Sequence, residues 1–256
     1  PLYKELENLK FENKNIMKDL DKYRKQQDME LELYRNENYF ENVKKYIKTT
    51  IDKIIDTLYS WEFISKNEED KYELTWKGKI AANVNEVHGL MVAEFISKNK
   101  LDDLSSSDLV SIFSCFTNLN IREEFRLFTP KFENKNVNNL VIEMMQTLKD
   151  YEDYEYKNNI DVPNNDKEII FDIMNEVVEW YNAENEDSCK KILINLQKKK
   201  EIFLGEFVKA LLKINNIVQE LICVCEITGN VKLNSKLNVI SSKLLKYVAT
   251  NQSLYV

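Results

Sequence analysis

The chain has 256 residues, of which 43% are hydrophobic and 31% charged, with only 4 Gly and 3 Pro. This composition excludes collagen-like and Gly/Pro-rich disordered proteins, and so few turn-forming residues argue against a β-sandwich or barrel. The net charge is −7, and no apolar run reaches the roughly 18 residues that a membrane-spanning helix needs. We therefore expect a mostly α-helical bundle that does not enter a membrane.

The N-terminal part is expected to form a helical arm, residues 1–38. It is polar and dense in charge, with scattered apolar residues at helical spacing, which predicts one or two long exposed helices. It starts at Pro1 with neither an initiator methionine nor the apolar core of a signal peptide, so we expect a fragment of a longer protein.

Residues 39–82 are typical of part of a winged-helix module with its β-hairpin. Residues 39–59 form an amphipathic helical pattern, and alternating segments at 61–65 and 71–75 flank a polar turn. The apolar stripe of the helix consists of Phe40, Val43, Ile47, Ile51, Ile54, Ile55 and Leu58. The order of helix, two-stranded wing and Leu-Thr-x-Lys-Gly predicts a winged-helix remnant.

Residues 83–256 read as a helical bundle throughout. Ser105 to Asp108 form a strong N-cap signal, Asp187 or Ser188 can cap a short helix, and Gly229 is a typical stop signal. The acidic segment 151–166 is expected to be a surface loop. The expected helices are 87–96, 109–116, 137–151, 167–181, a short one ending at Leu196, 205–228 and 231–248.

The cysteines and the single histidine favour structural roles. The four cysteines form no Cys-x-x-Cys pair, which predicts buried free thiols in a reducing intracellular compartment and no metal site. We expect His88 to be structural or exposed, and one histidine makes Ser-His-Asp catalysis a poor hypothesis. The sequence therefore predicts no catalytic residues.

Charge is distributed unevenly along the bundle. Residues 139–187 carry three lysines against fourteen acidic residues, a net charge of −11, whereas residues 188–256 carry a net charge of +7. Because binding responds to the local field, the overall acidity does not exclude a polyanion site.

The predicted helix 205–228 carries one polar stripe. Lys209, Lys213, Asn216 and Glu220 follow one another at i, i+4, i+7 and i+11, so they lie on one face. The simplest interpretation is a solvated helix face.

Two segments together resemble the C-terminal region of the exosome-associated Ski-like and TRAMP-type DExH-box RNA helicases. The first runs from Leu74-Thr75-Trp76-Lys77-Gly78-Lys79-Ile80-Ala81-Ala82 to the helix at 109–116. The second runs from Val178-Glu179-Trp180 through Ile227-Thr228-Gly229-Asn230 to the terminal Ser253-Leu254-Tyr255-Val256. The resemblance covers roughly residues 40–256.

This resemblance implies a multidomain ATP-dependent 3′-5′ RNA helicase, of which this chain is the non-catalytic, RNA-guiding and motor-bracing C-terminal module. Its implied partners are single-stranded RNA, the RecA-like domains of the same polypeptide and an RNA-decay complex. ATP and Mg²⁺ would belong to the motor, because this chain has no Gly-x-x-x-x-Gly-Lys-Thr loop and no DExH box. Nuclear and cytoplasmic locations both remain open.

By the same resemblance, helix 205–228 corresponds to a family helix that touches the RNA. Lys209 and Lys213 match positions that usually carry Arg, and Asn216 and Asn83 match positions that carry Glu. Lys can supply point charge to a phosphate but not the planar fork of Arg. We expect Lys213 to be the freer cation, because Glu206 lies three residues before Lys209.

Two alternatives compete with this interpretation. One is a helical adaptor whose arm binds a partner protein and which has no nucleic-acid role. The other is a stand-alone winged-helix regulator of duplex DNA, which is weakened because residues 39–59 lack the Arg/Asn/Gln-rich surface of a base-reading helix.

Overall fold

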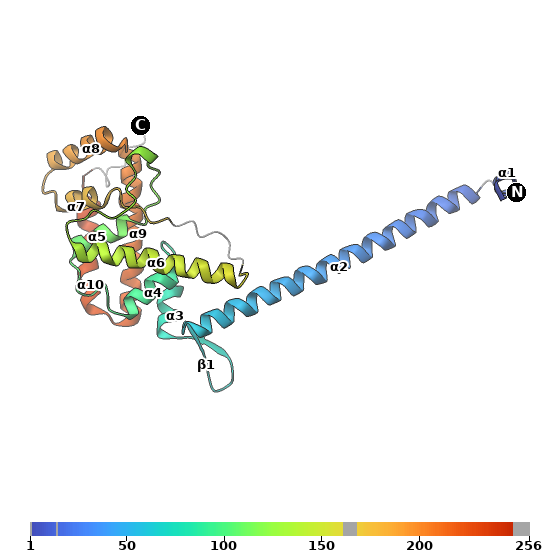
Figure 1. Ribbon diagram of the computed structural model, residues 1–256, viewed down its shortest axis with the longest axis horizontal. Coiled ribbons are helices and arrows are strands. Elements are labelled where there is room, and N and C mark those ends of the chain that lie inside the picture. The colour runs from blue at the N-terminus through green and yellow to red at the C-terminus, as the bar shows by residue number, and fades with distance from the viewer. Residues whose placement is uncertain (1, 14, 161–167, 248–256) are drawn as a thin grey trace. The chain divides into compact units, whose positions relative to one another are not determined.

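The computed structural model describes residues 2–13, 15–160 and 168–247 (Figure 1). It is 71% helical with one two-stranded antiparallel hairpin, so the predicted mostly α-helical class is confirmed. The predictions for the loop 161–166 and for the last residues, 248–256, lie outside the described residues. The elements are α1 Leu2–Glu12, α2 Ile16–Ser60, β1 Ile64–Lys66, β2 Tyr72–Leu74, α3 Trp76–Ala82, α4 Gly89–Ser97, α5 Ser106–Ser114, the 3₁₀ turn η1 Glu123–Phe125, α6 Lys135–Lys157, α7 Met174–Asn182, α8 Glu186–Lys200, α9 Leu204–Thr228, α10 Val231–Leu237 and α11 Ile240–Leu244.

The chain divides into two compact units, residues 1–55 and residues 56–256. The first unit contains α1 and most of α2, and none of its described residues is buried. Helix α2 continues without a break from Ile16 to Ser60, whereas the sequence pattern suggested that a separate helix begins near residue 39. The sequence predicted long exposed helices in residues 1–38, but it did not predict that α2 continues from this region through residues 39–59.

The second unit contains the predicted β-hairpin, with shorter strands than expected. Ile64 pairs with Leu74 and Lys66 with Tyr72 in antiparallel register. After β2, the Thr75 hydroxyl accepts a hydrogen bond from the backbone N–H of Gly78 at 3.0 Å and caps α3. A side chain at position 78 would collide with the hairpin, because a Cβ there would lie 1.9 Å from the carbonyl oxygen of Phe63.

Helix α9 supports the core of the second unit. It contacts α3, α5, α10 and α11 (Figure 1), and its inward stripe is fully buried. Trp180 of α7 is also fully buried; its indole N–H donates to the carbonyl of Leu244 at 2.9 Å, and its ring meets Phe207 edge to face. The buried residues of α9 are Phe207, Ala210, Leu211, Ile214, Ile217, Val218, Leu221, Val224 and Cys225.

Helix ends follow the local signals where capping residues mark them. Ser105, the first residue of the predicted N-cap segment, caps α5 and forms a capping box with Asp108, so α5 begins three residues before its expected start at Leu109. Gly229 ends α9 with φ 70°, as its stop signal predicted. The cap of α8 is Asn185 rather than Asp187 or Ser188, and α8 continues to Lys200 instead of ending at Leu196.

Three other boundaries differ from the sequence prediction. Helix α6 continues to Lys157, six residues beyond its expected end at residue 151. Helix α7 begins at Met174, because the preceding residues are occupied by tertiary contacts: the N–H of Ile170 donates to the carbonyl of Cys115 at 2.9 Å. The expected last helix is interrupted at residues 238–239, which divides its described part into α10 and α11.

Cysteine and histidine environments agree with structural roles, with one exception. Cys115, Cys189 and Cys225 are buried free thiols, and burial raises the pKa of Cys225 to about 12. Cys223 is exposed, contrary to prediction, because it lies on the outer face of α9. His88 caps α4 by accepting a hydrogen bond from the Met91 N–H, and its ring stacks on Tyr151.

Candidate nucleic-acid interface

The candidate interface is the polar stripe of α9 with the loop between α3 and α4. The four stripe residues occupy the outer face of α9, opposite its buried stripe. Lys209 and Asn216 are exposed, and Lys213 and Glu220 are half-buried. The helical spacing therefore places the predicted residues on one face, and their partners decide what that face can bind.

Lys209 carries the available positive charge of this stripe. The carboxylate of Glu206, which was expected to attract it, accepts a hydrogen bond from the backbone N–H of Phe203 at 3.0 Å. Among the described residues Lys209 forms no ion pair. Glu206 therefore caps α9 and forms no ion pair with the Lys209 ammonium group.

Lys213 is paired, so the expectation that it is the freer cation is wrong. Its Nζ forms an ion pair with Glu86 from the α3–α4 loop, and the Asn216 side-chain amide donates to the other oxygen of Glu86 at 3.3 Å. The Lys213 and Glu86 side chains are 24% and 28% exposed. A single carboxylate is therefore held by an ammonium and an amide donor, the same two kinds of group that hold a phosphate oxygen.

Glu220 fixes this loop to α9. Its carboxylate oxygen accepts hydrogen bonds from the backbone N–H groups of Asn85 and Glu86, each at 2.9 Å. The sequence marked Glu220 only as the end of the polar stripe. Its role and the presence of Glu86 were missed, because both depend on segments about 130 residues apart in the chain.

Asn83 lies at the start of the same loop. It is the C-terminal cap of α3, its side-chain amide donates to the carbonyl of Lys79 at 2.8 Å, and it is exposed. Because α3 contacts α9 and Glu220 anchors the loop two residues later, the structure brings the loop that Asn83 begins onto α9. The side-chain Oδ1 of Asn83 and the second hydrogen of its Nδ2 face the surface and can form hydrogen bonds with a ligand.

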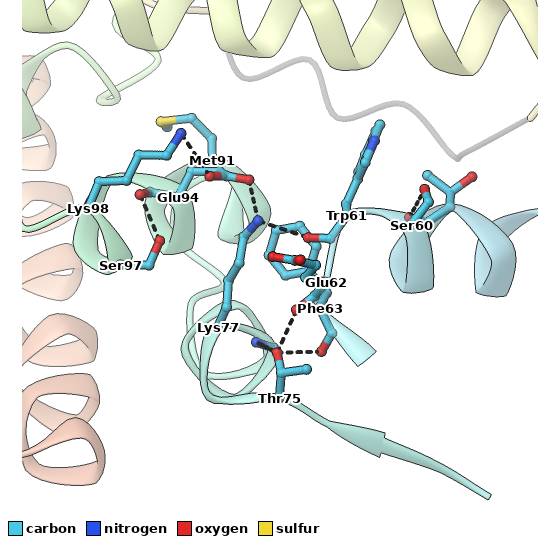
Figure 2. A network of polar contacts seen from close by, with 12 residues as sticks. Ser60, Trp61, Glu62, Phe63, Thr75, Lys77, Met91, Glu94, Ser97 and Lys98 are labelled. Carbon is cyan, nitrogen blue, oxygen red and sulfur yellow. Dashed lines mark hydrogen bonds and ion pairs between the residues drawn. The ribbon is translucent and has the colours of Figure 1, made fainter. Parts of the chain in front are cut away.

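A second polar network fastens the hairpin to α3 and α4 (Figure 2). Lys77 donates to the carbonyl of Trp61 at 2.9 Å, pairs with Glu94 and lies 4.1 Å from the centroid of the Phe63 ring. Lys98 pairs with the other oxygen of Glu94 at 3.2 Å. Burial raises the pKa of Glu94, but hydrogen bonds from Lys77 and Lys98 outweigh it and hold that pKa below its ordinary value.

An open pocket of about 860 Å³ lies beside this network. Its wall includes Tyr59 and Trp76, which are half exposed, together with Lys98 and three serines. The charged groups that line it from α3 and the end of α4, Lys77, Glu94 and Lys98, are already paired with one another. The network therefore stabilises the packing of the hairpin on α3 and α4 and offers no free charge for a ligand.

Residues 71–250 match the DSHCT (NUC185) domain, and the match covers both the α3–α4 loop and the whole of α9. The chain belongs to the DSHCT family. The chain is also 25% identical over 182 residues to the DExH-box ATP-dependent RNA helicase DExH9 of Arabidopsis thaliana. That alignment covers 70% of this chain but only 17% of the relative.

The chain thus combines a DSHCT domain with similarity to a short part of a DExH-box RNA helicase. The matched residues include β2 and the helices from α3 to α11, and the match leaves out residues 1–70, among them α1, α2 and β1. The described helices include none that is long and apolar enough to cross a membrane.

Proposed function

We propose that this chain guides single-stranded RNA and braces the motor domains of an ATP-dependent 3′-5′ DExH-box RNA helicase of the Ski-like or TRAMP type. The observation that carries the proposal is the exposed polar face of α9, with Lys209 unpaired in the described structure, inside a domain whose relative is a DExH-box RNA helicase. Single-stranded RNA and the RecA-like domains of the same polypeptide are the proposed partners, and an RNA-decay complex is the proposed setting.

The chemistry of this face suits a sequence-independent contact. An ammonium group and side-chain amides can bind phosphate and sugar oxygens without reading bases, which a protein that lets RNA slide past requires. Lys209, Asn216 and Asn83 are exposed for such contacts, whereas Lys213 must first exchange Glu86 for a phosphate.

ATP and Mg²⁺ would be bound by the motor domains and not by this chain. A phosphate loop needs glycines between a strand and a helix, and the four glycines here lie inside helices or at their ends. The residues present therefore do not fit a nucleotide site, and no step of ATP hydrolysis is assigned to them.

The test is Lys209→Ala in the helicase polypeptide that contains this chain, with single-stranded RNA affinity measured over a salt series. Losing one phosphate contact should weaken binding to all sequences alike and flatten the log–log salt slope by about 0.7 to 1. Lys191→Ala, which removes an exposed lysine from α8, is the matched control and should leave the slope unchanged. Equal slopes for the two variants would contradict an RNA contact at α9.

An adaptor function for residues 1–55 is the second candidate. Its support is the number of large apolar side chains that α1 and α2 leave exposed, which is typical of a protein-binding surface. In the first unit these are Leu2, Tyr3, Leu6, Leu9, Phe11, Ile16, Met17, Leu20, Tyr23, Met29, Leu31, Leu33, Tyr34, Tyr39, Phe40, Tyr46, Ile47 and Ile51.

A further inference from the structure

The Glu86 carboxylate is bound on α9 in the way that an anionic ligand is bound. Lys213 forms an ion pair with one of its oxygens, and the Asn216 side-chain amide donates to the other oxygen at 3.3 Å. An ammonium group and an amide donor are also suited to the oxygens of a phosphate group. The two side chains of α9 therefore hold an anion in this structure, and this anion belongs to the chain itself.

The two donors stay together without Glu86. Lys213 and Asn216 are three residues apart on α9, so they are neighbours on one face of the helix. Ile214 and Ile217, which follow them in the sequence, are buried in the core and fix the rotation of α9 about its axis. If the Glu86 side chain moves away, the ammonium and the amide still face the same side of the helix.

The α3–α4 loop is held on α9 independently of the Glu86 side chain. Glu220 accepts hydrogen bonds from the backbone N–H groups of Asn85 and Glu86, each at 2.9 Å. These bonds involve only the main chain of the loop, so the Glu86 side chain can change its rotamer while they remain. The carboxylate can thus leave Lys213 without detaching the loop.

The ion pair is within reach of a solute. The Lys213 and Glu86 side chains are 24% and 28% exposed, and Asn216 is exposed. Salt screens such a partly buried pair less than a fully exposed one. Because Glu86 is attached beside Lys213, it competes with any dissolved anion at an effective concentration of about a millimolar or more.

We propose that Glu86 is an internal competitor that closes a phosphate-binding site formed by Lys213 and Asn216. The apparent affinity of such a site is reduced by the fraction of molecules in which the site is open. The position of the Glu86 side chain thereby sets how strongly this part of α9 binds a phosphate group. Its relevance to single-stranded RNA rests on the function proposed above for α9.

Inorganic phosphate tests the competition in the intact chain without RNA. It is titrated into the unmodified chain and into Glu86→Gln at constant ionic strength, and the side-chain amide resonance of Asn216 is followed by NMR. Glutamine keeps the size of the side chain but removes the charge that pairs with Lys213. We expect Glu86→Gln to bind phosphate about tenfold or more tightly than the unmodified chain. Equal binding by the two proteins overturns the proposal.

Two controls locate the gain. Lys213→Ala in the Glu86→Gln background should abolish it, and a gain that survives this change shows that phosphate binds elsewhere and overturns the assignment. Glu179→Gln, an exposed change of the same charge on α7, should bind phosphate like the unmodified chain. If Glu86→Gln proves unfolded by circular dichroism, Glu86→Ala takes its place with the same expected gain.

This experiment separates the competitor from the RNA contact. Tighter phosphate binding by Glu86→Gln in a chain whose Lys209→Ala variant keeps its RNA salt slope supports the competitor and contradicts the proposed RNA contact. No gain in phosphate binding, together with the expected loss of slope in Lys209→Ala, overturns the competitor alone.

Discussion

Lys213 and Glu86 lie 127 residues apart in the sequence and meet only because the α3–α4 loop folds onto α9. The sequence could place Lys209, Lys213 and Asn216 on one helical face, because that requires only the 3.6-residue period. The sequence could not show which of these side chains is free to contact RNA and which is already paired. The partners that matter are a loop carboxylate and a helix N-terminus, and neither is visible from the spacing of charges along α9.

Glu86→Gln is expected to strengthen RNA binding if α9 contacts RNA. The amide removes the negative charge that holds Lys213, while Glu220 still anchors the loop through two backbone N–H groups. One more lysine becomes available to phosphate, so the log–log salt slope should steepen by about 0.7 to 1.

Glu179→Gln removes an exposed carboxylate from α7 and serves as the control for net charge. If the Glu86→Gln variant matches this control in both RNA affinity and log–log salt slope, Lys213 does not contact RNA even without its ion pair to Glu86.

The Glu94 clamp should make stability depend on pH. The pKa of Glu94 is lowered in the folded chain. The ionised carboxylate therefore contributes fully to the free energy of unfolding above pH 4.5, the pKa in the unfolded chain, and this contribution is lost as the pH falls through the pKa of the folded chain. Glu94→Gln should therefore lower the melting temperature at neutral pH, and the difference from the unmodified chain should shrink as the pH falls below 4.5. A difference that stays constant over this range would mean that the Glu94 charge does not stabilise the fold.

At the scale of elements, prediction succeeded where a local signal specified the structure. The Ser105 cap, the Gly229 stop and the β-hairpin all depend on residues that are close together in the chain. The start of α7 was misplaced, because residues 168–173 have an apolar pattern that fits a helix but are held by contacts with other segments. Ile170 bonds to Cys115, and Asp172 bonds to Leu127.

Gly78 is expected to be indispensable to the join between the hairpin and α3. Gly78→Ala would force a methyl group against the Phe63 carbonyl, a backbone atom that can move only if the hairpin shifts, so we expect a loss of about 2 kcal/mol or more in unfolding free energy. Gly205→Ala is the matched control. It meets open space in the first turn of α9 and should be neutral or stabilise the chain by up to about 1 kcal/mol.

Chemical denaturation of the two glycine variants measures both effects. Equal stability of Gly78→Ala and the unmodified chain would mean that the hairpin does not pack against α3 as closely as the structure indicates.

At the scale of the whole molecule, composition alone determined the fold class, because a chain with so few glycines and prolines has few ways to build anything but helices. The family membership and the bundle agree with that expectation. A pocket of about 260 Å³ beside Asp172 could not have been predicted, since its wall combines residues 118–121 and 126 with residues 168, 170 and 172.

The purified chain is expected to show no ATP hydrolysis, with or without RNA. None of its glycines lies in a strand-to-helix loop that could hold phosphates. RNA-stimulated phosphate release measured on the isolated chain, and retained after a second purification step, would contradict the assignment of catalysis to motor domains elsewhere in the polypeptide.

The absence of any buried side chain among the described residues of the first unit has a consequence for how these residues become ordered. A helix that buries nothing is governed by the helix–coil equilibrium, in which each turn depends on its neighbours and the ends fray first. Its helix content should therefore fall gradually with temperature, while the core around α9 melts cooperatively. Residues 1–55 and the bundle consequently belong to different thermodynamic regimes although one peptide chain connects them.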